Sequence, residues 1–260
     1  MTFLAFDDIG LRYEGQDRVV QALEGLSFTV DAGEPIAVIG PSGCGKSSML
    51  LLAAGLLVPG RGTVNIDGSP LTAPRRETSL ILQEHGLLPW KTTEDNAALG
   101  LRIRGADRRE SRERAREALA LVGLGEFARS YPGELSGGMR QRVGLARAVA
   151  LDADLLLMDE PLSALDALRR EDLQDVLLDL WRRRGHAQVL VTHSIEEAVF
   201  LGKRVVVMSP SPGRVKAIVE NPGMGEADYR SSPEFHERCA ELRRILAAEG
   251  ALHAGAVVRP

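Results

Sequence analysis

The chain has 260 residues, 44% of them hydrophobic and 26% charged, which suits one large globular domain or two small ones. Its mild formal net charge of -4 argues against a protein that binds nucleic acid through bulk positive charge. The cysteines, Cys44 and Cys239, are too few for a disulfide framework or a metal cluster and fit a reducing cytosol. The first residues lack the pattern of a secretion signal, and the longest apolar run, residues 49–58, is about half of the ~20 residues that span a bilayer. We therefore expect any membrane role to depend on a partner.

The N-terminal region reads as strands. Apolar and polar side chains alternate over residues 3–30, which predicts half-buried antiparallel strands. A turn at residues 31–34 leads into residues 35–39, a short apolar run that predicts a buried strand. Tyr13 either stacks on a nucleotide base or packs within its strand, and the residues alone favour neither interpretation.

A phosphate-binding pattern of Gly, four residues, Gly, Lys and Ser follows the buried strand. It consists of Gly40, Pro41, Ser42, Gly43, Cys44, Gly45, Lys46 and Ser47, and the residues after it, 48–54, predict a helix. Glycines let successive backbone N–H groups point at an anion, and the helix N-terminus adds its positive dipole end. We predict that Lys46 reaches the β- and γ-phosphates of a nucleotide and that the Ser47 hydroxyl ligates Mg²⁺. A glycine-rich turn with a chance lysine would leave the flanking strand and helix unexplained.

A helical block follows two more short strands. Residues 63–66 with a tight turn after them, and residues 79–82 ending at Gln83, predict these strands. From about residue 96 to 150 the periodicity is helical, and residues 111–122 predict an amphipathic helix with a charged face. We interpret this block as a helical subdomain inserted into an α/β core.

A second helix N-terminus in this block is a candidate anion site. Ser136 is a good N-cap for a helix over residues 139–150, and Gly137 and Gly138 leave the start of that helix accessible. An ordinary capped helix explains these residues equally well when they are considered alone.

Adjacent carboxylates, Asp159 and Glu160, end the continuous apolar run of residues 155–158. Charge at the end of a buried strand needs a partner, and Mg²⁺ bound with a nucleotide would supply one. We predict that Asp159 holds the metal through water and that Glu160 orients or deprotonates the attacking water as a general base. The alternative, a merely polar strand end, does not account for the phosphate loop upstream.

Helices and strands alternate in the rest of the chain. Residues 167–184 predict a long helix, residues 188–192 a buried strand ending at His193, and residues 204–208 another strand before a turn. The chain is then broken by Gly and Pro, and it becomes helical again over residues 233–248.

Taken in this order, the motifs resemble those of the nucleotide-binding subunits of ATP-binding cassette (ABC) transporters over residues 3–220, with residues 135–141 matching the signature motif. By this resemblance the residues that contact ATP or Mg²⁺ are Tyr13, which stacks on adenine, Gly40 to Ser47, Ser48, Gln83, Ser136, Gly137, Gly138 and Asp159. The metal ligands among them are Ser47, Gln83 and Asp159. The catalytic residues are Lys46, Glu160 as the catalytic glutamate, and His193 as the switch histidine that senses the γ-phosphate.

The resemblance also implies a fold and an assembly. The fold is an α/β P-loop NTPase with a RecA-like core, an antiparallel β-subdomain and a helical subdomain at about residues 90–150. Residues 1–220 would form the ATPase domain and residues 221–260 a short helical tail. In this family two copies face head to tail, so that the phosphate loop of one copy and the signature helix of the other grip the same ATP. A homodimer of this kind would explain two anion sites in one chain.

A narrower resemblance, to importers of nitrate, alkanesulfonates and taurine, rests on residues 84–90, 166–167, 195–200 and 210–215. The pattern is most similar to that of the taurine and sulfonate importers. It implies a membrane permease and an external solute-binding protein as partners, no nucleic acid, and a peripheral place at the cytoplasmic face of the inner membrane.

The predicted contact with the permease is an exposed apolar patch of Leu87, Leu88 and Trp90 beside Gln83. The alternative is that Trp90 is buried in the helical subdomain.

Competing functions fit the sequence less well. Soluble cassette proteins of translation or DNA repair usually carry two cassettes or a long coiled coil, and this chain shows neither pattern. A regulator that binds ATP without hydrolysing it would not need both Glu160 and His193. An exporter would more often have its membrane helices fused to the cassette.

Overall fold

The computed structural model describes residues 1–15, 19–83 and 86–254, the side chains of residues 248–254 excepted. By its internal contacts the chain divides into two compact units. Unit 1 comprises Met1–Pro74 and Gly185–Pro260, and unit 2 comprises Arg75–Arg184. In the part of the chain that is described, no helix is both long and apolar enough to cross a membrane.

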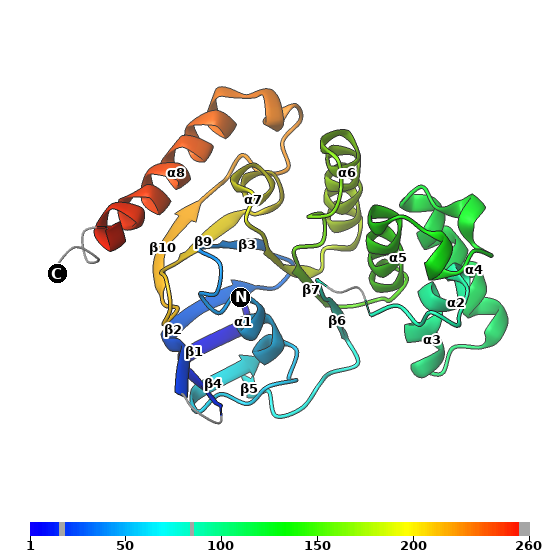
Figure 1. The fold of residues 1–260 in the computed structure, drawn as a ribbon, viewed down its shortest axis with the longest axis horizontal. Coiled ribbons are helices and arrows are strands. Elements are labelled where there is room, and N and C mark those ends of the chain that lie inside the picture. The colour runs from blue at the N-terminus through cyan, green and yellow to red at the C-terminus, as the bar shows by residue number, and fades with distance from the viewer. Residues whose placement is uncertain (16–18, 84–85, 255–260) are drawn as a thin grey trace. The chain divides into compact units, whose positions relative to one another are not determined.

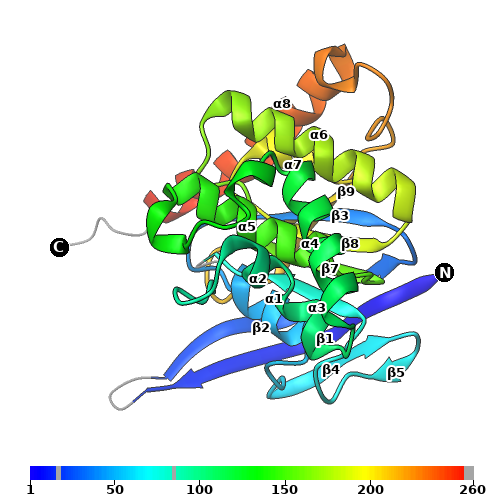
Figure 2. The same cartoon turned by 90° about the vertical axis from the view of Figure 1, so that its right-hand side faces the viewer.

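Unit 1 contains an antiparallel sheet with strand order β2-β1-β4-β5 (Figure 1). The strands are β1 (Thr2–Glu14), β2 (Val19–Asp31), β4 (Arg61–Ile66) and β5 (Ser69–Pro70). Figure 2 shows β1 and β2 as a long pair of ribbons. Their buried faces carry the apolar residues of the alternating pattern, and the rings of Phe6 and Phe28 stack with centroids 4.6 Å apart. The predicted antiparallel strands are therefore confirmed.

The tight turn predicted after β4 is also present. Asp67 and Gly68 have φ values of 49° and 73°, and they join β4 to β5 in a two-residue hairpin. This conformation suits an Asp-Gly pair because its twist matches that of the flanking strands and glycine meets no steric penalty at positive φ.

Unit 1 also contains a mostly parallel layer of buried strands, in the order β10-β9-β3-β8. They are β3 (Pro35–Ile39), β8 (Ala187–Val191), β9 (Arg204–Met208) and β10 (Val215–Glu220). β3 pairs in parallel with β8 and β9, and every residue of β3 and β8 is buried. Continuous apolar runs produce such strands because neither face of the sheet is exposed to water.

Helices complete unit 1. They are α1 (Lys46–Ala53), α7 (Ile195–Leu201), the 3₁₀ turn η3 (Tyr229–Ser231) and α8 (Pro233–Ala254). α7 packs against β3, and α8 packs against α7 and β9. The C-terminal helix is thus part of unit 1, and it continues beyond residue 248, where the periodicity predicted its end.

Unit 2 combines two parallel strands with helices (Figure 2). The strands are β6 (Thr78–Ile81) and β7 (Leu155–Asp159). The helices are α2 (Thr93–Ala97), α3 (Leu99–Ile103), α4 (Arg108–Leu121), η1 (Gly125–Phe127), η2 (Pro132–Glu134), α5 (Gly137–Val149) and α6 (Ala167–Arg184). α2, α4 and α5 pack on one another. The predicted helical block is present, and α6 has the predicted bounds.

The start of α5 differs from the prediction by two residues. The helix begins at Gly137 rather than at residue 139, because the Ser136 side chain caps it by accepting a hydrogen bond from the Met139 N–H at 3.2 Å. An N-cap bonds to the third helical residue, so the glycines lie inside the first turn.

Candidate nucleotide-binding site

The phosphate loop lies in unit 1 between the buried strand β3 and helix α1. Gly45, the residue before α1, has φ of 96°, a left-handed conformation that favours glycine. No side chain caps α1 among the residues that the structure describes, and its first turn contains no acidic residue. The start of α1 therefore offers backbone N–H donors and a positive dipole end to an outside anion, which fits a phosphate group.

Lys46 adds a positive charge to this loop. Its side chain is buried, and its Nζ donates hydrogen bonds to the carbonyl oxygens of Gly40 at 2.8 Å and Pro41 at 2.9 Å. The ammonium group is thus held at the loop itself, where an anion bound by the backbone N–H groups would meet it.

Cys44 is a packing residue of the loop. Its side chain is fully buried, and burial raises the pKa of the thiol, although the nearby Lys46 acts in the opposite direction. A neutral, enclosed thiol is a poor nucleophile, so Cys44 contributes shape to the loop and no reactivity.

The turn that contains Gly213 supports the phosphate loop, a role that neither the turn pattern nor the importer resemblance of residues 210–215 predicts. A Cβ atom on Gly213 would lie 1.9 Å from the Cys44 carbonyl oxygen, so only glycine fits. The Gly213 N–H donates to the Ala22 carbonyl at 2.9 Å, and the Glu24 N–H donates to the Gly213 carbonyl at 3.0 Å. Sequence offers no signal for this contact because the groups are far apart along the chain.

Tyr13 lies at the end of β1 with 42% of its surface exposed. Its hydroxyl is hydrogen-bonded to the Ser48 Oγ at 3.0 Å, and Ser48 is in the first turn of α1. The exposure excludes a tyrosine packed within the core. An aromatic face beside the phosphate loop suits stacking on a base.

His193 follows β8 and is exposed. The bend beside it is fixed by Thr192, whose hydroxyl donates to the Glu197 carboxylate and accepts from the Ser194 N–H at 3.1 Å. Ser194 caps α7 by accepting from the Glu197 N–H at 3.2 Å. Unit 1 thus carries the phosphate loop, Tyr13 and His193 among the predicted site residues.

In unit 2 the predicted carboxylates end β7. Asp159 is buried as the last residue of the strand, and Glu160 follows it with φ of 48°. A glutamate in the left-handed region is strained, and such residues cluster at functional sites. The Asp159 carboxylate, like the Ser47 hydroxyl of unit 1, is an oxygen donor of the kind that Mg²⁺ prefers.

The signature segment also belongs to unit 2. Ser136 and Gly137 are exposed at the start of α5. A Cβ atom on Gly138 would lie 2.9 Å from the Leu165 Cδ2, so glycine lets the helix approach the loop after β7 closely. The exposed helix start has the chemistry of an anion site.

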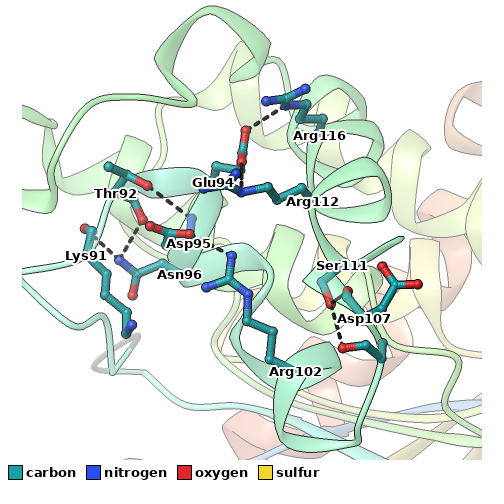
Figure 3. Close-up of polar contacts among 11 residues, drawn as sticks. Lys91, Thr92, Glu94, Asp95, Asn96, Arg102, Asp107, Ser111, Arg112 and Arg116 are labelled. Carbon is teal, nitrogen blue, oxygen red and sulfur yellow. Dashed lines mark hydrogen bonds and ion pairs between the residues drawn. The ribbon is translucent and has the colours of Figure 1, made fainter. Parts of the chain in front are cut away.

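The loop before α2 presents Trp90, which is 71% exposed, so the alternative of a buried tryptophan is wrong. Gln83 is also exposed, Leu87 and Leu88 are half-buried, and Glu84 and His85 lie outside the described residues. The fully buried Asn96 holds this loop, as Figure 3 shows in part. Its amide nitrogen donates to the carbonyl oxygens of Leu88, Lys91 and Thr92 at 3.0–3.1 Å, and its Oδ1 accepts from the Leu88 N–H at 2.8 Å.

Salt bridges join the helices next to this loop (Figure 3). The Glu94 carboxylate of α2 pairs with Arg112 at 3.1 Å and with Arg116 at 2.6 Å, both on α4. Because Glu94 is buried, these partners compensate a charge that would otherwise be costly. These ion pairs therefore fix α2 to α4, and α2 in turn carries Asn96, which holds the loop that contains Trp90.

Comparisons with known proteins agree with this geometry. Residues 23–163 match the family described as ABC transporter. The chain is 46% identical to the taurine import ATP-binding protein TauB of Chromobacterium violaceum, over 90% of this chain and 92% of that protein. It is 45% identical to TauB of Pseudomonas aeruginosa strain UCBPP-PA14, over 98% of this chain and all of that protein.

Solved structures of similar fold include the dimeric bacterial ABC transporter cassette MJ0796, with a TM-score of 0.78 and 30% identity over 84% of this chain and 98% of that one. The same cassette in a dimeric post-hydrolysis state bound to ADP and phosphate has a TM-score of 0.77 and 31% identity, with the same coverage. The family match spans more than half of the chain and includes the phosphate loop, the signature segment and the carboxylates after β7. The chain therefore belongs to the ABC transporter family, as an ATP-binding cassette with ATPase activity.

Proposed function

We propose that this chain is the ATP-hydrolysing subunit of an importer for taurine or a related alkanesulfonate. The observation that carries this proposal is the 45% identity, over 98% of this chain, to a full-length taurine import ATP-binding protein. The patterns at residues 84–90 and 210–215, which resemble those of sulfonate importers, point to the same solute class. The cassette supplies energy in this proposal, and the permease selects the solute.

The phosphate loop and the tyrosine beside it would hold ATP. In unit 1 Tyr13 stacks on adenine, and the loop from Gly40 to Ser48 binds the phosphates, with Lys46 at the β- and γ-phosphates. Bound Mg²⁺ would neutralise phosphate charge, and Ser47, Gln83 and Asp159 are the residues that would hold it.

The hydrolytic step depends on Glu160 and His193. The Glu160 carboxylate accepts a proton from the water that attacks the γ-phosphorus, while His193 contacts the γ-phosphate. Most of the rate enhancement comes from positioning and charge stabilisation, as expected for phosphoryl transfer. The strained backbone of Glu160 supports this role, because strain persists where the surrounding structure enforces one geometry.

We further propose a head-to-tail homodimer in which Ser136, Gly137 and Gly138 of one copy contact the ATP bound to the other. The exposed start of α5, which offers backbone N–H donors to an anion, supports this arrangement. The permease would bind the surface around Trp90, an external solute-binding protein would deliver the solute, and the complex would sit at the cytoplasmic face of the membrane. Exposed tryptophan is typical of such contacts.

The catalytic assignment is tested with Glu160→Gln. Removing a general base lowers the rate by roughly 100- to 10,000-fold, so we expect ATPase activity to fall at least about 100-fold while ATP binding persists. The matched control is Glu117→Gln, which changes an exposed carboxylate on α4 and should leave the rate unchanged. Wild-type turnover in the Glu160 variant would contradict the assignment.

The importer assignment is tested by gentle affinity purification of the chain from its own cells, followed by mass spectrometry. We expect a multi-span permease in the eluate and loss of that permease with Trp90→Ala. In the reconstituted complex, taurine with its binding protein should stimulate ATP hydrolysis more than nitrate does. Only soluble ribosomal or DNA-bound partners in the eluate would favour a cassette protein of translation or DNA repair instead.

A further inference from the structure

Gln141 uses both ends of its side chain to connect α5 with the loop after β7. It is 2% exposed. Its Nε2 donates to the Glu160 carbonyl at 3.1 Å, and its Oε1 accepts from the Ala164 N–H at 3.0 Å. All of these residues belong to unit 2. These two hydrogen bonds explain why a glutamine occupies this buried position. An apolar side chain of similar size would leave the Glu160 carbonyl and the Ala164 N–H without these partners.

The Glu160 carbonyl oxygen accepts several hydrogen bonds. Besides Gln141, it accepts hydrogen bonds from the Ser163 Oγ at 3.1 Å and the Ser163 N–H at 3.3 Å. Glu160 itself has φ of 48°, which is disfavoured for a residue with a Cβ atom. A backbone in this region persists only where neighbouring groups hold it, and these bonds are such a restraint. The bond from Gln141 is therefore one of the contacts that hold the Glu160 backbone in this conformation.

The same loop touches the start of α5. The nearest atoms to a Cβ on Gly138 would be the Leu165 Cδ2 at 2.9 Å and the Ala164 carbonyl oxygen at 3.4 Å. Gln141 lies five residues after Ser136, about 7.5 Å along the helix axis at 1.5 Å per residue. The start of α5 and the Glu160 backbone are thus linked by packed and hydrogen-bonded groups of unit 2.

We propose that Gln141 is a positioning residue that links the signature end of α5 to the Glu160 backbone, so that engagement of the helix start sets the orientation of the general base. The proposal rests on the proposed function, since it takes Glu160 as the base. It adds a coupling between the start of α5 and Glu160. In the proposed head-to-tail dimer, the start of α5 would contact the ATP of the partner copy, and Glu160 would act on the ATP bound to its own copy.

The test compares Gln141→Met with Arg142→Met in the full-length chain. Methionine keeps most of the side-chain volume and removes the hydrogen bonds. Arg142 is the next residue of α5, is similarly buried, and donates from Nη1 to the Val122 carbonyl at 2.9 Å, away from Glu160. For Gln141→Met we expect kcat to fall roughly 10- to 100-fold with the Kd for ATP unchanged, because misplacement of a catalytic group affects the chemical step. For Arg142→Met we expect kcat per folded molecule to be unchanged.

Two further variants keep the test decisive. Gln141→Glu preserves size and the acceptor for the Ala164 N–H but cannot donate to the Glu160 carbonyl when ionised, so its kcat should fall at least as far. Ser163→Ala removes another donor to the same carbonyl, and its effect should be non-additive with Gln141→Met because the two bonds hold one group.

The outcomes separate this proposal from the assignment of Glu160. Glu160→Gln is measured in the same assay. If that variant stalls while Gln141→Met turns over at the wild-type rate, the coupling is wrong and the general base stands. If Gln141→Met and Arg142→Met lose kcat and thermal stability together, Gln141 is only a packing residue and the coupling is again wrong. If Glu160→Gln hydrolyses ATP normally, both proposals fall.

Discussion

Two helix N-termini, one in each unit, present the same backbone groups in different ways. α1 is preceded by Gly45 in a left-handed conformation, and no described side chain caps it. α5 is preceded by Ser136 in an extended conformation, and the Ser136 Oγ accepts the Met139 N–H. The first helix start therefore leaves its backbone donors to an outside group such as an anion or water, while the second is partly satisfied by the chain itself.

The supports behind these helix starts differ as well. The phosphate loop is backed by another part of unit 1, with Gly213 against the Cys44 carbonyl and Leu23 against Gly45. The start of α5 is backed by the loop after β7, through Gly138 and Gln141. In unit 1 the helix start proposed to bind phosphate is thus supported by distant segments of the same unit, whereas in unit 2 the helix start is tied to the residue proposed for catalysis.

Among the changes that test the difference between the two helix starts, the largest expected effect comes from Lys46→Ala. Hydrogen bonds to charged groups contribute about 1.5–3 kcal/mol each, so losing the ammonium should weaken ATP binding by the isolated chain roughly 10- to 100-fold. Isothermal titration with ATP measures this, with Lys203→Ala, an exposed lysine of the same unit, as the control. An unchanged titration would refute the phosphate loop as the nucleotide site.

A smaller effect is expected from Gly213→Ala. The new methyl group would meet the Cys44 carbonyl, and overpacking of this kind costs about 1–3 kcal/mol. We expect a lower melting temperature and several-fold weaker ATP binding, since the phosphate loop must shift. Gly133→Ala adds a methyl group where no atom lies within 4 Å and should change neither quantity. Equal behaviour of the two variants would show that the Gly213 turn does not support the loop.

The smallest effect on the isolated chain is expected from Ser136→Ala. Loss of an N-cap costs about 1 kcal/mol of stability, and ATP titration of the single chain should be unaffected. In the assembled dimer, ATP hydrolysis should fall, because the proposed contact with the partner's nucleotide is removed. Asp107→Ala removes the N-cap of α4 and should cost similar stability without lowering hydrolysis. If the isolated Ser136→Ala chain bound ATP more weakly than the wild type, the proposal that only the start of α1 binds ATP within one chain would be wrong.

Local patterns explain why much of the fold was predictable. The apolar run of β3, the Asp-Gly turn after β4 and the bounds of α6 follow from side chains that are neighbours in sequence. The helical periodicity of residues 111–122 likewise predicted α4, which begins three residues earlier, at Arg108, and ends one residue earlier, at Leu121. The ends of helices were predicted less accurately than their presence. The start of α5, for example, lies two residues before the predicted one, directly after its cap Ser136.

The sequence by itself determined the phosphate loop, the carboxylates after β7 and the capped helix of the signature segment, because each is a short pattern whose residues act on adjacent backbone. Only the tertiary structure decided that Gly213 packs on Cys44, that Asn96 holds the loop with Trp90, and that Gln141 bonds to the Glu160 carbonyl. The contacts of Gly213 and Gln141 join groups 169 and 19 residues apart, and no local preference of the chain encodes which distant groups will meet.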